Sequence, residues 1–179
     1  MARTSTVIGS LHLVDGKAVV RMEDRFATDA GDLWSALTDR GRLARWIAQV
    51  DGDLRVGGAF HAIFTSGWEG PGRIEVCEAP RRLLLRLSPG QEDETVIEAR
   101  VFPAGSMTRL VIEERGLPLG EAAAHGGGWQ THIEDLAAHI AGRQPSEWRA
   151  RWVELTPAYQ DQQAQLMLEA RGHTRGESD

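Results

Sequence analysis

The chain has 179 residues, of which 41% are hydrophobic and 26% charged, a composition typical of a soluble globular domain with or without an appendage. Its 20 Lys and Arg residues against 26 Asp and Glu residues give a net charge of −6, which argues against nucleic acid or an anionic membrane as the main partner. The single cysteine excludes an internal disulfide, no apolar run approaches the ~20 residues that span a bilayer, and the first residues lack a secretory signal, so we expect a cytoplasmic protein.

The first predicted element is a β-hairpin over residues 7–27. Asp15-Gly16 marks its tight turn, because this dipeptide accepts positive φ angles. The hydrophobic period then changes over residues 28–47. There Asp29 and Asp39 stand where N-cap residues are expected, and they predict two short consecutive helices.

A run of short strands is predicted next, because the hydrophobic period returns to two between residues 51 and 115. Glycine, proline and serine separate the alternating segments, and one predicted turn is Gly70-Pro71-Gly72. The expected strands are 59–65, 73–78, 83–87, 95–102 and 107–115. Strands this short, joined by tight turns, form an antiparallel meander, which needs another element to cover its apolar face.

That cover is the helix predicted for residues 121–141, where apolar residues recur at helical spacing and Gly142 supplies the end. Three glycines, 126–128, come just before Trp129, and a glycine inside a helix costs about 1 kcal/mol relative to alanine. Two interpretations stay open. The glycines belong to the loop that enters the helix, or they leave room for a ligand or for close backbone contact with the sheet.

The remaining residues, 143–179, read as a helical appendage. Trp148 and Trp152 lie four residues apart on a short helical turn, and Thr156-Pro157 has the cap-and-N1 signature of a separate last helix that runs to about Arg171. Two exposed tryptophans would harm solubility, so we expect them to pack on the parent domain or on a second subunit. A homodimer through residues 143–179 is one hypothesis.

This order of elements predicts an α+β fold, in which a curved antiparallel sheet wraps around a long helix and leaves an interior space. The local sequence resembles the SRPBCC (START/Bet v 1-like) superfamily, in particular the branch named after the activator of Hsp90 ATPase. The matching pieces are Leu33-Trp34-Ser35-Ala36-Leu37-Thr38-Asp39, Trp46, Val56-Gly57-Gly58-Ala59-Phe60, Gly70-Pro71-Gly72-Arg73-Ile74, Pro80-Arg81-Arg82-Leu83, Met107-Thr108-Arg109-Leu110, His125 and Gly128-Trp129. The resemblance implies a helix-grip domain over residues 1–142, with a cavity for an apolar or amphipathic small molecule, and a C-terminal extension over 143–179 that lies outside it.

Two groups of side chains are candidates for the cavity wall. In a helix-grip fold the core and the cavity wall are one surface, so aromatic and apolar residues of the strands and of the long helix qualify. The first group is Trp46, Phe60, Phe64, Trp68, His125, Trp129 and Ile133. The second, polar group is His61, Glu69 and Arg73. A buried carboxylate or histidine there could exchange protons, although alternating charges on strands more often form the solvated face.

His125, His132 and His139 recur every seven residues, which places them along one edge of the predicted helix. Seven residues advance a helix by about 10.5 Å, so no two of these histidines can bind the same zinc ion. The sequence also lacks the GxSxG elbow of a hydrolase. We therefore assign no catalytic residue, no metal and no cofactor.

The sequence favours a binding protein for a small apolar or aromatic molecule, since no catalytic set is recognisable. The alternative is a cyclase- or hydrolase-like enzyme that uses the same cavity. An interaction protein like the Hsp90 ATPase activator is the least supported hypothesis, because the resemblance does not extend to a separate Hsp90-binding domain.

Overall fold

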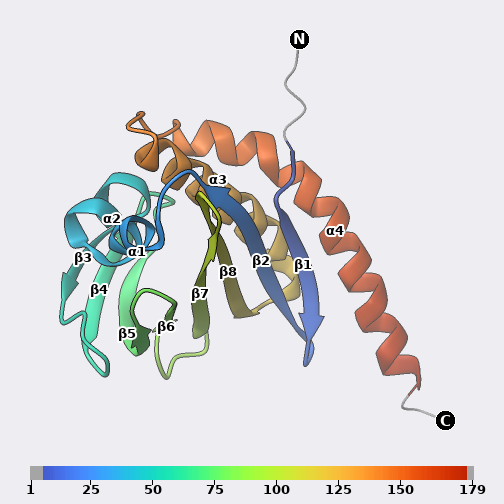
Figure 1. The fold of residues 1–179 in the computed structure, drawn as a ribbon. Helices are drawn as coiled ribbons and strands as arrows, with labels where there is room; N and C mark the ends of the chain where they lie inside the picture. Colours follow the sequence, from blue (N-terminus) through green and yellow to red (C-terminus); the bar gives the residue numbers. More distant parts are fainter. Residues whose placement is uncertain (1–5, 177–179) are drawn as a thin grey trace.

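The computed structural model describes residues 6–176, in which one eight-stranded antiparallel sheet curves around a long helix (Figure 1). The strands lie in the order β1-β2-β8-β7-β6-β5-β4-β3. Their bounds are β1 Gly9–Val14, β2 Lys17–Phe26, β3 Ala48–Gly52, β4 Ala59–Phe64, β5 Glu69–Glu78, β6 Arg82–Leu87, β7 Thr95–Ala104 and β8 Met107–Leu117. The helices are α1 Ala30–Thr38, α2 Arg40–Trp46, the short 3-10 helix η1 Leu119–Glu121, α3 Ala122–Ile140 and α4 Trp148–Gly176.

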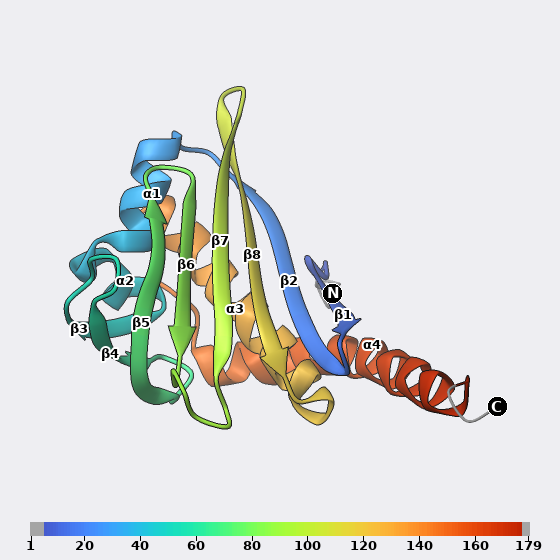
Figure 2. The same cartoon turned by 90° about the horizontal axis from the view of Figure 1, so that it is seen from below.

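The first half of the chain follows the predicted turn and caps. Asp15 and Gly16 adopt φ angles of 50° and 73° between β1 and β2, which is the left-handed conformation of a two-residue hairpin turn. Asp29 and Asp39 each accept a hydrogen bond from the backbone N–H three residues later, and so cap α1 and α2. These two helices lie over the β3 side of the sheet (Figure 2).

The core lies between the concave face of the sheet and α3, which runs behind the strands in Figure 2. Alternating residues of the strands supply one side of this core, and Ile133 and Leu136 of α3 supply the other. The opposite face of the sheet carries arginine and glutamate side chains in ion pairs. This architecture confirms the predicted α+β helix-grip fold.

One predicted turn is wrong. Gly70-Pro71-Gly72 belongs to β5, which begins at Glu69 and pairs with β4. The two glycines leave room for aromatic rings rather than for a turn, because a Cβ atom on Gly70 would lie 2.8 Å from the Trp68 ring and one on Gly72 would lie 2.2 Å from the Phe60 ring. The edge strand β3, Ala48–Gly52, is an element that the sequence pattern did not predict.

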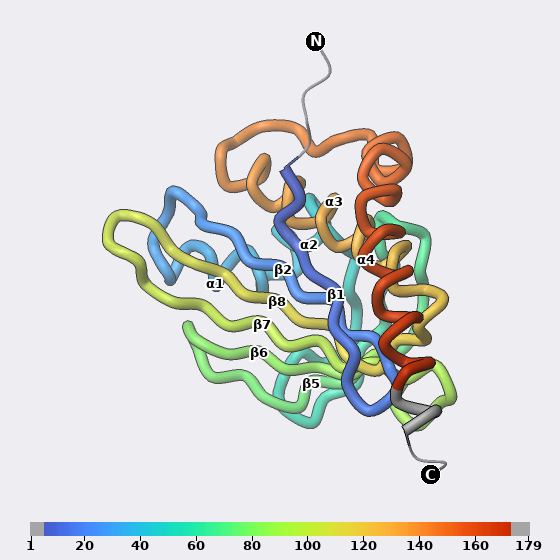
Figure 3. The backbone as a smooth tube through the Cα atoms, turned by 90° about the vertical axis from the view of Figure 1, so that its right-hand side faces the viewer, coloured from blue at the N-terminus to red at the C-terminus, as the bar shows by residue number. Residues whose placement is uncertain are grey.

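The C-terminal extension is one continuous helix rather than a short turn followed by a separate helix. Pro157 lies inside α4, and the Thr156 hydroxyl donates to the Trp152 carbonyl instead of capping a new helix. The helix packs along α3 and then beside β1 (Figure 3). At its centre the buried Tyr159 hydroxyl donates to Gln130 Oε1 of α3 at 2.6 Å and accepts from the Gly9 N–H of β1 at 3.1 Å.

The three glycines before Trp129 lie inside α3, so the prediction that they belong to the entry loop is wrong. They face α4 rather than the sheet, and Gly128 also lines a cavity between α3 and α4, which agrees with the predicted role of leaving room for a ligand. A Cβ atom on Gly126 would lie 2.5 Å from the Tyr159 ring, and one on Gly127 would lie 2.5 Å from Thr156 Oγ1. The glycine run therefore lets the two helix backbones approach closely.

Further predictions concern membrane-spanning helices and what covers the tryptophans of residues 143–179. No helix in the described part of the chain is both long and apolar enough to cross a membrane. The tryptophans of the extension pack on the parent domain, since Trp152 Nε1 donates to the Ala124 carbonyl of α3. A homodimer through residues 143–179 stays a prediction.

Candidate functional site

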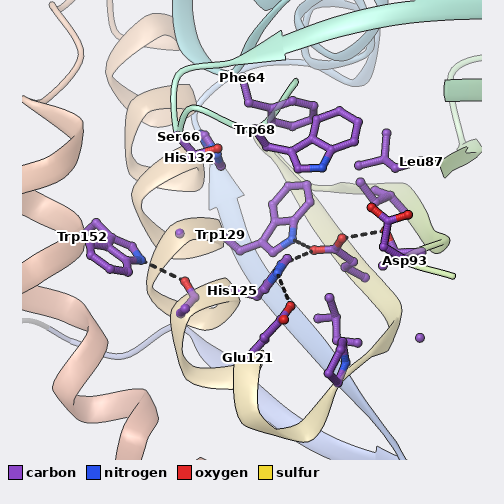
Figure 4. Close-up of a pocket in the computed structure, with 18 of the residues that line it drawn as sticks. Phe64, Ser66, Trp68, Leu87, Asp93, Glu121, His125, Trp129, His132 and Trp152 are labelled. Carbon is purple, nitrogen blue, oxygen red and sulfur yellow. Dashed lines mark hydrogen bonds and ion pairs between the residues drawn. The ribbon is translucent and has the colours of Figure 1, made fainter. Parts of the chain in front are cut away.

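An open cavity of about 600 Å³ lies between the first half of α3, the start of α4 and the ends of several strands (Figure 4). The β4–β5 turn and the β6–β7 loop form the rest of its rim. Aromatic side chains supply much of its wall: Phe64, Trp68, Trp129, Trp148 and Trp152. Trp148 and Trp152, both of α4, stack with their ring centroids 6.1 Å apart, and Trp129 comes from α3, so both helices present flat apolar surface to the cavity.

A second, inner cavity of about 130 Å³ lies deeper in the core, under α2 and the end of α1. Its lining is almost wholly apolar and includes Trp46 and Phe60. Four side chains line both spaces and so form the partition between them: Phe64, Leu87, Ile97 and Trp129. Trp129 is thus part of the wall that the two cavities share.

A buried carboxylate, Glu114 of β8, forms the inner wall of the open cavity. Its Oε1 accepts a hydrogen bond from Thr95 Oγ1 at 2.8 Å, and its Oε2 accepts from Trp129 Nε1 at 2.7 Å. Oε2 also lies 3.1 Å from His125 Nδ1 (Figure 4). Burial by itself would raise the pKa of Glu114, but the hydrogen bonds from His125, Trp129 and Thr95 hold that pKa below its ordinary value.

His125, the histidine that contacts Glu114, lies on the first turn of α3 and lines the cavity. Its Nε2 lies 3.8 Å from Glu121 Oε2, which is beyond hydrogen-bond distance. Burial would lower the pKa of His125, but the hydrogen bond and charge of Glu114, with help from Glu121, raise that pKa above its ordinary value. The ring therefore has one nitrogen against Glu114 and the other directed toward Glu121, and His125 and Glu121 both line the open cavity.

His132 lies two turns further along the same edge of α3, also in the cavity lining, and the rings of Phe64, Trp129 and Trp148 enclose it. Its Nδ1 is 3.3 Å from Trp148 Nε1, which donates to it. Burial lowers the pKa of His132 to about 4, against the opposing effects of a hydrogen bond with the Trp46 backbone and of the Glu114 charge. His132 is thus a neutral acceptor that positions Trp148 on the cavity wall.

The structure gathers most of the predicted apolar candidates. Phe64, Trp68, His125 and Trp129 line the open cavity. Trp46 and Phe60 line the inner cavity, and of the predicted candidates Phe64 and Trp129 line both. Ile133 is only 2% exposed and packs in the core, outside both linings.

The three polar candidates do not face either cavity, and that prediction was wrong. His61 and Glu69 are exposed and form a 2.9 Å ion pair across β4 and β5, and Arg73 pairs with Glu75. Strand alternation explains the error, because Phe60, Ala62 and Ile74 point inward and their neighbours must then point outward. Glu98 likewise lies on the outer face, where Arg82, Arg100 and Arg115 surround it.

Sequence reasoning missed Glu114, although a signal was present. On β8 the inward positions are Leu110 and Ile112, so the same alternation assigns the next inward position to Glu114 rather than to Glu113. A carboxylate at an inward position of an apolar strand must find donors, and here it finds them in side chains from β7 and α3.

Charged residues surround the mouth of the open cavity. The acidic ones are Glu92, Asp93 and Glu121, and the basic ones are Lys17 and Arg149. With three acidic and two basic residues, the mouth carries a small excess of negative charge.

Within residues 6–176, no group of three or more His, Cys, Asp or Glu side chains is arranged to hold a metal ion.

Comparisons with known proteins agree on the fold. Residues 27–141 match the family described as activator of Hsp90 ATPase homolog 1-like protein. The crystal structure of CalU16 from Micromonospora echinospora superposes with a TM-score of 0.70 at 24% identity, over 87% of this chain and 96% of that chain, and its solution structure gives 0.71. DynU16, a protein of the dynemicin biosynthetic locus, gives 0.65 at 24% identity, over 71% of this chain and 48% of that chain. No curated protein matches the sequence.

Proposed function

The chain belongs to the family of activator of Hsp90 ATPase homolog 1-like proteins, and we propose that it binds a small, neutral, largely apolar or aromatic molecule in the open cavity. The observation that carries this proposal is the combination of an aromatic wall with a single fully hydrogen-bonded carboxylate at its inner end. Cavities of this size, lined by rings and a few placed polar groups, are the usual form of small-molecule sites.

Apolar surface provides most of the binding free energy in such a site. Each 100 Å² of apolar ligand surface removed from water contributes roughly 2.5 kcal/mol. The flat faces of Trp129, Trp148 and Trp152 suit a planar ring system, because stacked and edge-on aromatic contacts add to that burial.

The polar groups favour an uncharged ligand that carries a hydrogen-bonding group. The acidic residues at the mouth, Glu92, Asp93 and Glu121, disfavour an anion. His125, a residue of the cavity lining, provides one directional contact, and the four partition residues limit how deep the ligand reaches.

The experiment is a titration with N-phenyl-1-naphthylamine, a neutral dye whose fluorescence rises when it enters an apolar site. We expect a saturable rise at one dye per chain. The variant Ala124→Trp tests the place of binding, because Ala124 is an exposed α3 residue that lines the cavity. The added indole should fill the mouth and weaken dye binding at least about tenfold.

Ala164→Trp is the matched control, since Ala164 is an exposed alanine of α4 outside both cavity linings. It should bind the dye like the unmodified protein. Equal affinity in the Ala124→Trp and Ala164→Trp variants, or no saturable binding at all, would refute the proposed function.

A further inference from the structure

We propose that His125 and Glu114 form an acid–base pair that moves a proton of the molecule held in the open cavity, which makes this protein an enzyme as well as a binder. The inference rests on the proposed function, because the substrate must occupy that cavity.

The hydrogen bonds decide which nitrogen of His125 can react. An ionised carboxylate only accepts hydrogen bonds, so the His125 Nδ1 that lies 3.1 Å from Glu114 Oε2 must carry the hydrogen. In the neutral ring the lone pair is then on Nε2, which lies 3.8 Å from Glu121 Oε2, and both residues line the cavity. The pair therefore presents a base to the ligand.

Glu114 is a positioning residue in this scheme. It is 4% exposed, and its other two donors, Trp129 Nε1 and Thr95 Oγ1, fix its carboxylate from two different elements. A fixed carboxylate on one imidazole nitrogen sets the tautomer and the ring orientation, and it stabilises the imidazolium that forms when the other nitrogen takes a proton.

The strength of this base limits the substrate class. A neutral imidazole can remove only an acidified proton, so we assign the substrate as an apolar carbonyl compound with a C–H bond next to its carbonyl group. The C–H bond breaks and its electron pair forms a C=C bond, the π pair of the carbonyl group moves onto its oxygen to give the enolate, and Nε2 holds the proton. Return of that proton to another atom of the same molecule completes an isomerisation, which needs no further reactant.

Charged groups from several elements face the pair and set its pH dependence. Glu121 of η1 and Glu114 of β8 flank the ring, and the cavity wall adds Lys17, Arg149 of α4, and the loop acids Glu92 and Asp93. The two flanking carboxylates outweigh burial and raise the pKa of His125. Proton removal by the neutral ring should therefore rise with pH through a midpoint above 6.5.

The chain holds its own control for this arrangement. His61 and Glu69 form a second histidine–glutamate pair, at 2.9 Å, but both are exposed on the outer face of the sheet and neither lines a cavity. Within residues 6–176, both His61 and His125 are thus paired with glutamate, but His125 is the one whose pair joins an aromatic cavity.

The first test needs no ligand. ¹⁵N NMR of the histidine rings reports the tautomer of neutral His125, and we expect the hydrogen on Nδ1, with a titration midpoint above 6.5. Glu114→Gln, which keeps a similar shape but loses the charge, should lower that midpoint. A neutral ring with its hydrogen on Nε2 would overturn the proposal, because that nitrogen could not accept a proton.

The second test uses 5-nitro-1,2-benzisoxazole, a flat aromatic probe that a base opens in one step. The base removes the C3 proton, the electron pair forms a nitrile, and the N–O bond breaks to give a coloured phenolate. We expect the unmodified protein to open it at least about 100-fold faster than His125→Gln does, with Glu114→Gln slower and its pH midpoint lowered. His61→Gln should retain the full rate.

Displacement of N-phenyl-1-naphthylamine by the benzisoxazole shows that the probe occupies the cavity. If the benzisoxazole displaces the dye but the unmodified protein opens it no faster than His125→Gln does, the acid–base pair is refuted. The proposed binding function is not affected by that result. If the dye itself does not bind, both proposals fail together.

Discussion

Trp129 Nε1 lies 2.7 Å from Glu114 Oε2, so one of the four side chains between the two cavities is held by the carboxylate that also orients His125. The partition and the polar end of the cavity are thus one unit. A change at Trp129 should affect both.

Trp129→Phe tests this link. It removes the indole donor and leaves a buried carboxylate with one partner fewer, so we expect the free energy of unfolding to fall by about 1–3 kcal/mol in urea titrations. Trp34→Phe is the control, since Trp34 is also buried but its indole nitrogen has no hydrogen-bond partner among residues 6–176. Equal losses in the two variants would show that the hydrogen bond contributes nothing.

The glycines of α3 give a second prediction. A Cβ atom on Gly127 would lie 2.5 Å from Thr156 Oγ1 and 3.2 Å from Thr156 Cα, so Gly127→Ala must push α4 away. We expect a loss of about 1–3 kcal/mol in the free energy of unfolding. Gly128→Ala is its matched control, because that Cβ would meet the Trp148 ring at 3.5 Å, an ordinary contact, and alanine favours the helix by up to about 1 kcal/mol. Thermal unfolding that ranks the two variants in the opposite order would contradict the packing described above.

Tyr159→Phe probes the attachment of α4. The ring stays, but Gln130 Oε1 loses its 2.6 Å donor and the Gly9 N–H loses its acceptor. Since these groups lie at a buried junction, we expect a cost of about 1–3 kcal/mol in urea-induced unfolding. An unchanged midpoint would mean that water replaces the hydroxyl at no cost.

His132 predicts a pH dependence of stability. Its pKa is about 4 in the folded chain and ordinarily 6.5, so the neutral ring favours the fold at and above pH 6.5, and that contribution is lost as the pH falls from 6.5 toward 4. The loss amounts to about 3 kcal/mol. Urea titrations at pH 7 and pH 4 measure it, and the difference between the two should shrink by that amount in His132→Gln. Parallel pH profiles for both proteins would contradict the assignment.

Much of the fold was predictable because local chemistry determines it. Asp15-Gly16 has the backbone freedom that its turn needs, and Asp29 and Asp39 cap helices through their own side chains. The glycines at 70 and 72 were misassigned as a turn for a physical reason. Their role depends on which aromatic rings cross them, and that is decided by pairing with β4, a partner outside the local sequence.

The site was less predictable, because it depends on contacts between segments that are distant in the sequence. Aromatic candidates such as Trp129 followed from periodicity, whereas His61 and Glu69 differ from cavity residues only in strand register. Glu114 was within reach of the alternation of β8, but its three donors come from β7 and two positions of α3. A local sequence pattern does not predict contacts between three segments that are distant in the chain.

Binding in the open cavity is the central claim, and the six tryptophans of the chain allow a direct test. Four of them, Trp68, Trp129, Trp148 and Trp152, line that cavity, whereas Trp34 and Trp46 do not. In a ¹H–¹⁵N spectrum of the indole N–H groups, assigned by Trp→Phe variants, saturation with N-phenyl-1-naphthylamine should move the first four signals and leave the other two in place. Equal shifts of all six signals, or no shift in the four, would contradict this account.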